Sequence, residues 1–153
     1  MHDVAWDLTA WLLRSYPTVE FDRAAVLFGA ATHDIGKVRH PRELSGPGSD
    51  HEAAGYELLL GQGIDERLAR FAQTHGCWDR PGTELEDLLV SLADKVWKAK
   101  RIPDLERLVV GRLAEASGEQ AWQTFLKLDE ELDRLATGAD RRLDFQNRYP
   151  VAA

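Results

Sequence analysis

The sequence predicts an all-α protein, and three observations support that prediction. Apolar residues recur at spacings of three and four along most of the chain, as in the stripe of Val4, Leu8 and Leu12. Segments rich in glycine and proline, such as 36–49 and 76–82, separate these stripes. No segment alternates apolar and polar residues over the length of a strand. We therefore expect a bundle of six to seven helices.

The first half of the chain divides into four expected helices. Their approximate ranges are 2–15, 22–33, 51–60 and 65–75. Asp22, Asp50 and Asp65 stand at three of the starts, where a carboxylate accepts hydrogen bonds from the free N–H groups of the first turn. Gly36 suits the exit from the second helix, because glycine is favoured at helix C-termini.

The second half divides into three more expected helices. Thr83 caps the fifth, which runs to about Lys100, and Pro103 is well placed as the first residue of the sixth, which ends near 117–118. The seventh covers about 119–136. Residues 138–153 are polar, and we expect them to form a loose tail.

Composition limits the possible partners. The chain has 153 residues, 44% of them hydrophobic, and a formal net charge of −7. An acidic chain of this kind is unlike a general binder of long nucleic acid or of a membrane surface, which carries a basic face. One cysteine excludes an internal disulfide, and no apolar run has the length of a membrane span. Because Asp3 and Asp7 stand near the N-terminus without a basic cluster, we expect no secretory signal and a cytoplasmic location.

Four of the five histidines fall at expected helix ends. They are His2, His33, His51 and His75. Asp94 interrupts the apolar run of the fifth helix, where a charge is costly unless it is paired or bound to a metal. Each histidine taken alone is more often a surface or capping residue than a ligand, and Asp94 could simply pair with Lys98 one turn later.

The dipeptide His33-Asp34 ends an apolar helix. Neighbouring residues within a helix point about 100° apart and chelate poorly, whereas at a helix end both side chains can face one ion. Imidazole and carboxylate without thiolate suit Mn, Fe, Co, Ni or Zn. A carboxylate such as Asp34 can also bridge two ions about 3.5–4 Å apart, as in two-metal hydrolases.

The run His33-Asp34-Ile35-Gly36-Lys37 resembles the signature of the HD superfamily of metal-dependent phosphohydrolases. The other elements of the resemblance occur in the same order: His2, then His51-Glu52-Ala53-Ala54-Gly55, then His75, then Ala93-Asp94-Lys95. The resemblance implies one HD domain over 1–153. Its metal-binding core would cover about 2–101, followed by C-terminal helices over about 103–137 and the tail over 138–153.

The resemblance also implies a binuclear centre and its chemistry. One ion would be held by His2, His33, Asp34 and Asp94, and the second by His51 and His75, with Asp34 as the bridge. The cofactors would be two divalent ions from the group Fe, Mn, Co, Ni and Zn. A metal-activated water would cleave a phosphate ester or anhydride of a small molecule, with a nucleotide as the expected substrate class. Asp34 and Lys37 are the expected catalytic residues.

Five residues are expected to bind the substrate. They are Lys37, Trp78, Arg80, Lys98 and Arg101. Lys98 and Arg101 follow Asp94 by four and seven residues and would share its helix face. Alternatively, Trp78 and Arg80 belong to an ordinary loop whose tryptophan ring simply packs against the rest of the protein.

Several further residues are expected to lie outside the centre. Lys95 and Lys100 should be solvated, His40 should be a loop residue, and Cys77 should be a small neutral residue. The remaining tryptophans, Trp6, Trp11, Trp97 and Trp122, should lie in the core.

Two alternatives to the phosphohydrolase stay open at this point. One is a mixed-valence di-iron oxygenase, which resembles this chain in ligand order, and the other is a non-catalytic signalling domain, which would lack ligands. The Gly-Tyr-Pro element of the cyclic-dinucleotide branch is missing, and residues 51–94 look more like diadenosine tetraphosphate hydrolases. We expect a small phosphorylated partner and neither long nucleic acid nor a membrane. A homodimer is compatible with the sequence.

Overall fold

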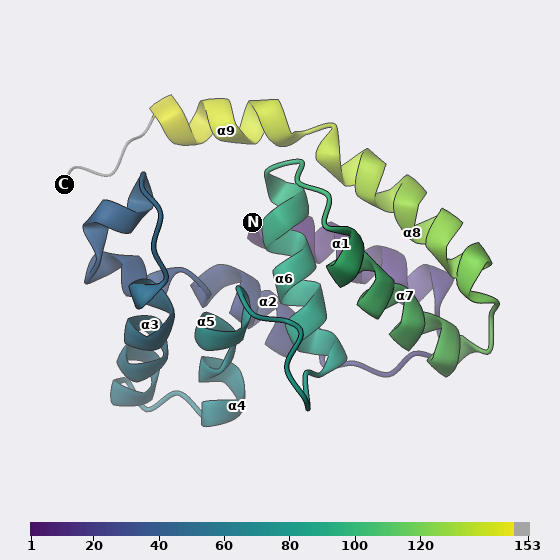
Figure 1. Ribbon diagram of the computed structural model, residues 1–153, viewed down its shortest axis with the longest axis horizontal. Coiled ribbons are helices and arrows are strands. Elements are labelled where there is room, and N and C mark those ends of the chain that lie inside the picture. The colour runs from purple at the N-terminus through teal and green to yellow at the C-terminus, as the bar shows by residue number, and fades with distance from the viewer. Residues whose placement is uncertain (149–153) are drawn as a thin grey trace.

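The computed structural model describes residues 1–148, and within them the chain is all-helical without a strand, as predicted. The helices are α1 (His2–Ser15), α2 (Arg23–Thr32), α3 (Asp50–Gly61), α4 (Glu66–Ala69), α5 (Phe71–Thr74), α6 (Leu85–Trp97), α7 (Pro103–Ser117), α8 (Ala121–Ala136) and α9 (Ala139–Arg148). Two 3₁₀ helices, η1 (Ile35–Val38) and η2 (Pro41–Leu44), lie between α2 and α3. In Figure 1, α6 runs through the middle, with α3–α5 on one side and α7 and α8 on the other.

The hydrophobic core is centred on α6. Most of its apolar side chains are almost fully buried, and they pack with buried residues of α1, α2, α7 and α8 in one cluster. Asp94 is buried in the same helix. The bundle therefore holds a charged side chain at a fixed position within an apolar helix.

The start of α6 differs from the expectation. Glu84, not Thr83, is the N-cap residue, and it forms a capping box with Asp87. Asp87 also accepts hydrogen bonds from Arg70 and from the Thr74 hydroxyl. This network fixes the segment that leads to His75 against α6.

The helix expected over 65–75 is present as α4 and α5, which are separated at Arg70. The backbone of Arg70 is still helical, with φ −53° and ψ −32°, so the break is small. His75 follows as the C-cap residue of α5.

Glycine at position 36 allows η1 to lie directly against α3. A Cβ atom there would stand 1.9 Å from the carbonyl oxygen of His51 and 2.5 Å from the amide nitrogen of Gly55. Both contacts are with backbone, which cannot move aside without shifting α3. The close approach brings the end of α2, with Asp34, beside the start of α3, with His51.

The prediction of a loose tail is wrong for residues 139–148, which form α9. Its Arg142 guanidinium donates hydrogen bonds to the carbonyl oxygen of Trp97, at 3.0 and 3.1 Å, and to that of Leu135, at 3.0 Å. These bonds satisfy free carbonyls at helix ends and dock α9 onto the end of α6. The rest of the expected tail, 149–153, lies outside the described residues.

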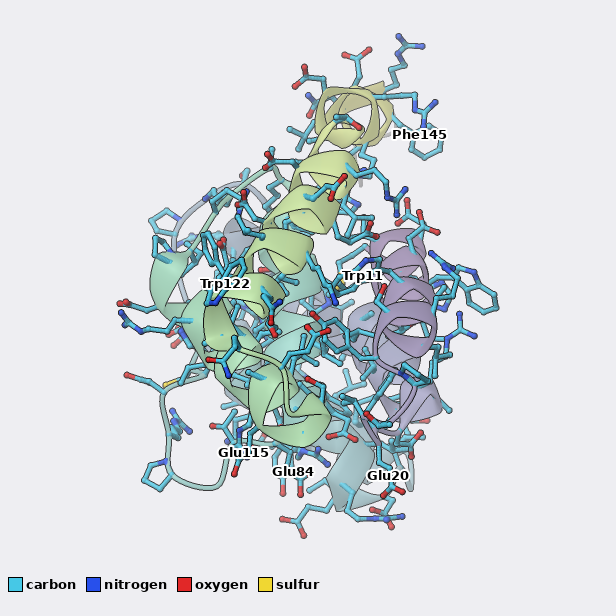
Figure 2. The ribbon with its side chains drawn as sticks, turned by 90° about the vertical axis from the view of Figure 1, so that its right-hand side faces the viewer. Trp11, Glu20, Glu84, Glu115, Trp122 and Phe145 are labelled. Carbon is cyan, nitrogen blue, oxygen red and sulfur yellow. The ribbon has the colours of Figure 1, made fainter. Side chains whose placement is uncertain are left out.

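The tryptophans divide between core and surface. Trp11 and Trp97 pack against the core, as expected. Trp6 and Trp122 are 50% and 63% exposed, so the prediction that they are core residues is wrong. Figure 2 shows Trp122 on α8 and Phe145 on α9. Among the described residues, no helix is both long and apolar enough to cross a membrane.

Candidate metal centre

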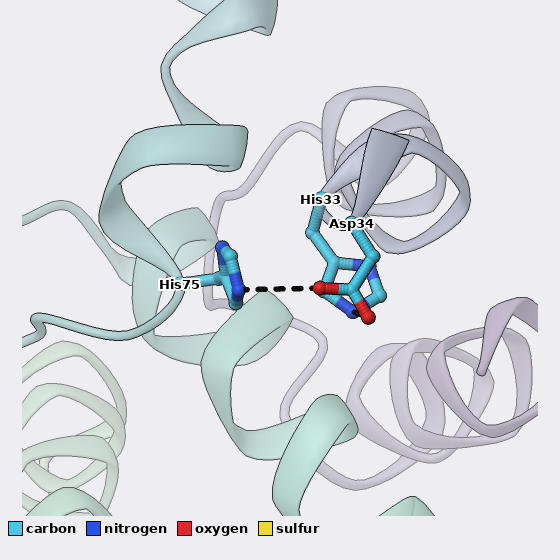
Figure 3. Close-up of side chains that lie close together, drawn as sticks. All are labelled: His33, Asp34 and His75. Atoms are coloured by element: carbon cyan, nitrogen blue, oxygen red, sulfur yellow. Dashed lines mark ion pairs between the residues drawn. The ribbon is translucent and has the colours of Figure 1, made fainter. Parts of the chain in front are cut away.

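Asp34 lies at the meeting point of three buried histidines. Its Oδ2 is 3.4 Å from Nε2 of His33, and its Oδ1 is 3.2 Å from Nε2 of His51 and 3.7 Å from Nε2 of His75. Figure 3 shows His75 facing His33 and Asp34, which lie together at the end of another helix, with the ion pair between His75 and Asp34 drawn as a dashed line. The fold therefore brings together residues that are up to 42 positions apart in the sequence.

Each of the three histidines has its other ring nitrogen occupied. Nδ1 of His33 lies 3.2 Å from the carbonyl oxygen of Ala30, and Nδ1 of His75 lies 3.0 Å from that of Ala72. Because a carbonyl only accepts, Nδ1 must donate in both cases. A neutral ring then presents the lone pair of Nε2, which is the arrangement of metal-binding histidines in proteins.

For His51, the same orientation comes from a carboxylate. Glu43 Oε2 accepts from Nδ1 of His51, and the Glu43 carboxylate also accepts the backbone N–H groups of Asp50 and His51. Nε2 of His51 is buried without a hydrogen-bond partner in the described chain. A buried nitrogen that faces a carboxylate and lacks a hydrogen bond fits a metal ligand.

Asp94 joins the group from α6. Its Oδ1 lies 3.6 Å from Nε2 of His33, and its two oxygens accept hydrogen bonds from Lys98, at 3.0 Å, and from Lys95, at 2.7 Å. The expectation that Lys95 is solvated is therefore wrong. Its long side chain folds back along α6 onto the neighbouring carboxylate.

The electrostatics of the cluster favour positive charge. Burial acts to raise the pKa of Asp34, but His33 and Lys37 outweigh it and hold that pKa well below its usual range. The pKa of Asp94 is lowered in the same way, by His33 and Lys95 against the effect of burial. Burial acts to lower the pKa of His33, and the two carboxylates raise it above the usual value. Both carboxylates are thus anionic at neutral pH and attract cations.

His75 behaves differently. Burial, and then the charge of His33, lower the pKa of His75 to about 4. The ring is neutral at neutral pH, which is the state that a metal ligand requires.

Lys37 and Lys98 are near the centre as predicted. Lys37 Nζ is 2.7 Å from Oδ2 of Asp34, and Lys98 contacts Asp94. Trp78 is partly buried against the core, and its ring lies 5.6 Å from Nζ of Lys95. Arg80 is exposed in the same loop, with its Nε 3.1 Å from the sulfur of Cys77.

Arg101 does not share the face of Asp94. The helix ends at Trp97, and Ala99 takes a left-handed backbone conformation with φ 55°, so the helical spacing from Asp94 no longer applies. The Arg101 guanidinium pairs instead with carboxylates of α7 and α8. Its partners are Glu106, Asp129 and Asp133. We find Arg101 in a network that joins helices, away from the centre.

His2 is not brought into the cluster. It is the first residue of α1, and its exposed side chain forms no hydrogen bond or ion pair within residues 1–148. Its role as a ligand stays a prediction from the sequence.

Two acidic residues near the centre were not identified from the sequence. Glu43 lies in a loop without periodicity, eight positions before its partner His51, so no pattern marks it. Glu52 lies beside His51, and its carboxylate is within 4.8 Å of ligand atoms of His51 and His75. The dipeptide His51-Glu52 is the only sequence signal for either residue.

The donor atoms form two overlapping groups, each compact enough for one ion. The first contains His33, Asp34 and His75, and the second contains His51, Glu52 and His75. A third group of His40, Glu43 and Asp50 lies nearer the surface, so His40 is a loop residue beside two carboxylates. Nitrogen and oxygen donors without sulfur fit divalent transition metals.

Comparison with known families identifies the class of this protein. The family model described as HD domain matches residues 4–97, which is more than half of the chain. The chain therefore belongs to the HD-domain family, whose members are metal-dependent hydrolases that bind divalent metals. Comparison with curated proteins and with solved structures gives no match.

Proposed function

We propose that this chain is a metal-dependent phosphohydrolase with a binuclear centre. The observation that carries the proposal is that the two oxygens of the Asp34 carboxylate face different histidines. One oxygen faces His33, and the other faces His51 and His75. A carboxylate placed in this way can give one oxygen to each of two ions, with Asp94 completing the side of His33.

Two divalent ions in such a site supply a nucleophilic water at neutral pH and neutralise charge on phosphoryl oxygens. The chain itself would position the substrate. The ammonium groups of Lys37 and Lys98 border the two carboxylates and can each exchange that contact for a phosphoryl oxygen. Asp34 and Lys37 would thus act together, with Asp34 fixing the ions and Lys37 holding the phosphate.

A small phosphorylated molecule, with a nucleotide as the first candidate, fits the surroundings of His75. Trp78 can stack on a base, and Arg80 can pair with a phosphate that extends beyond the centre. The net charge of −7 argues against long nucleic acid as the substrate.

The donor set also suits a di-iron oxygenase, because nitrogen and oxygen ligands of this kind hold iron equally well. A non-catalytic domain is less favoured, since it would lack ligands, whereas here five of the six expected ligands, all except His2, lie together: His33, His51 and His75 around Asp34, and Asp94 beside His33. The reaction that the metal-loaded protein catalyses distinguishes the hydrolase, the oxygenase and the non-catalytic domain.

The test is phosphate release from p-nitrophenyl phosphate, mononucleotides and dinucleoside polyphosphates, with each of Mn²⁺, Co²⁺, Ni²⁺, Fe²⁺ and Zn²⁺ under anaerobic conditions. We expect turnover that depends on the metal and disappears in Asp34→Asn. Asp104→Asn, at an exposed position on α7, is the control and should keep full activity. Oxygen consumption by the iron-loaded protein without phosphate release would favour the oxygenase and contradict the proposal.

A further inference from the structure

Glu52 extends from the first turn of α3 toward the end of α5. Its carboxylate lies with the ring nitrogens of His51 and His75, all within 4.8 Å of one another. The side chain also reaches the backbone just after His75, because a Cβ atom at Gly76 would stand 2.4 Å from Oε1 of Glu52. The carboxylate is therefore directed into the histidine cluster rather than out to solvent.

No local structural role accounts for this carboxylate. Ser49 and Glu52 have the spacing of a capping box, but the N-terminus of α3 has no side-chain cap hydrogen bond. Within residues 1–148, the Glu52 carboxylate forms no hydrogen bond and no ion pair within 4.0 Å, and the charges of His51, Arg80 and Lys95 act on it only from greater distances. A partly buried carboxylate without a direct hydrogen bond or ion pair is costly, and a cation bound beside it would remove that cost.

We propose that Glu52 is a ligand of the ion held by His51 and His75. The inference rests on the proposed binuclear centre and adds a residue to it. The second ion would then have two imidazole nitrogens, the Glu52 carboxylate and Oδ1 of Asp34 as donors. Without Glu52, this ion would have only three protein donors, and the His33 side would be the better site.

Gly76 has a specific part in this arrangement. Its backbone is outside the left-handed region, so alanine is compatible with the local conformation. The added methyl group would collide with the end of the Glu52 side chain, which can swing away. Gly76→Ala should therefore displace the Glu52 carboxylate without removing it.

The experiment measures metal binding directly. Wild type, Glu52→Gln, Gly76→Ala and Asp34→Ala are titrated with Mn²⁺ and with Co²⁺ by calorimetry, and bound metal is counted by elemental analysis. Glu57→Gln is the matched control, because Glu57 lies on the same helix with a side chain 72% exposed. Circular dichroism and thermal melting establish that each variant is folded.

We expect two ions in wild type and in Glu57→Gln, and no tightly bound ion in Asp34→Ala. In Glu52→Gln and Gly76→Ala, one ion should remain and the second should bind at least ~10-fold more weakly, since even an indirect partner of a ligand changes metal affinity about 10- to 100-fold. Two ions of wild-type affinity in folded Glu52→Gln would overturn the role of Glu52 and leave the binuclear centre standing. Fewer than two ions in wild type would overturn both.

Discussion

Glu43 Oε2 lies 2.5 Å from Nδ1 of His51 and fixes the orientation of that ring. The same carboxylate accepts the backbone N–H groups of Asp50 and His51, both at 3.2 Å, so it is itself held in place. A histidine that is oriented by a carboxylate is a stronger ligand, because the carboxylate fixes the tautomer and raises the basicity of Nε2.

Replacing Glu43 should therefore weaken metal binding although Glu43 touches no proposed ion. We expect Glu43→Ala to lower metal affinity about 10- to 100-fold, as measured by calorimetric titration with Mn²⁺. Glu20→Ala, at an exposed position between α1 and α2, is the control. An affinity of the wild-type value in Glu43→Ala would show that the contact with His51 is only structural.

Because η1 lies so close to α3, we predict that replacing Gly36 and replacing Gly61 by alanine have opposite effects on the free energy of unfolding. At position 36, an added Cβ atom would collide with backbone atoms of His51 and Gly55, whereas at Gly61 it would meet nothing within 4 Å. We expect Gly36→Ala to lower the free energy of unfolding by more than ~3 kcal/mol, because overpacking against backbone has no relief.

Gly61→Ala should raise the same free energy by up to ~1 kcal/mol, since alanine favours the helix. Urea unfolding of the two variants measures both effects. A Gly36→Ala protein as stable as wild type would mean that η1 and α3 are further apart than described.

Arg101 should matter for stability and not for hydrolysis. Its partner Glu106 is only 6% exposed, and removal of the guanidinium would leave that carboxylate buried without its cation. We expect Arg101→Ala to lower the free energy of unfolding by about 2–4 kcal/mol, toward the low end of the effect of breaking a buried pair, because Arg101 is partly exposed.

The control for this change is Arg107→Ala, whose exposed pair with Asp104 should contribute less than ~1 kcal/mol. The value of kcat/KM in folded Arg101→Ala should match wild type. A KM several-fold higher at unchanged stability would instead support the substrate-binding role that the sequence suggested.

His75 predicts how stability depends on pH when metal is removed with EDTA. Burial, and then the charge of His33, lower the pKa of this ring from 6.5 in the unfolded chain to about 4. Between these values the unfolded state binds more protons than the folded state, so the free energy of unfolding falls as the pH falls from 6.5 toward 4. The contribution of this group is at most ~3 kcal/mol.

The other shifted groups of the cluster affect stability outside the range of pH 4 to 6.5. The raised pKa of His33 affects stability above pH 6.5, and the lowered values of Asp34 and Asp94 affect it below pH 3.8. Urea unfolding across pH 4 to 6.5 should therefore give a flatter profile for His75→Gln than for wild type. Equal slopes in the two proteins would contradict the assignment.

The sequence was sufficient to predict most of the helices and most of the residues that meet at the candidate metal centre. Periodicity located α1, α2 and α6–α8, and the family resemblance singled out His33, Asp34, His51, His75 and Asp94 among many polar residues. Periodicity depends on neighbouring residues, and the resemblance depends on the order of motifs along the chain, so both can be found in the sequence without knowledge of the fold.

Features that depend on tertiary contacts were beyond the sequence. The helix α9 is strongly polar, with Leu143 and Phe145 as its large apolar side chains, and its docking depends on Arg142 and the carbonyls of α6. Arg101 was misplaced because α6 ends early, at a turn through Ala99. Glu43 meets His51 through the fold of a loop, which no spacing rule describes.

The most direct test of the account is the metal content and activity of Asp34→Ala beside wild type. Asp34 contacts three histidines through its two oxygens, so its loss should remove both ions together. We predict about two divalent ions per wild-type chain and metal-dependent phosphate release, and neither bound metal nor hydrolysis in the folded variant. Retention of both ions, or of full hydrolysis, by Asp34→Ala would contradict the binuclear centre.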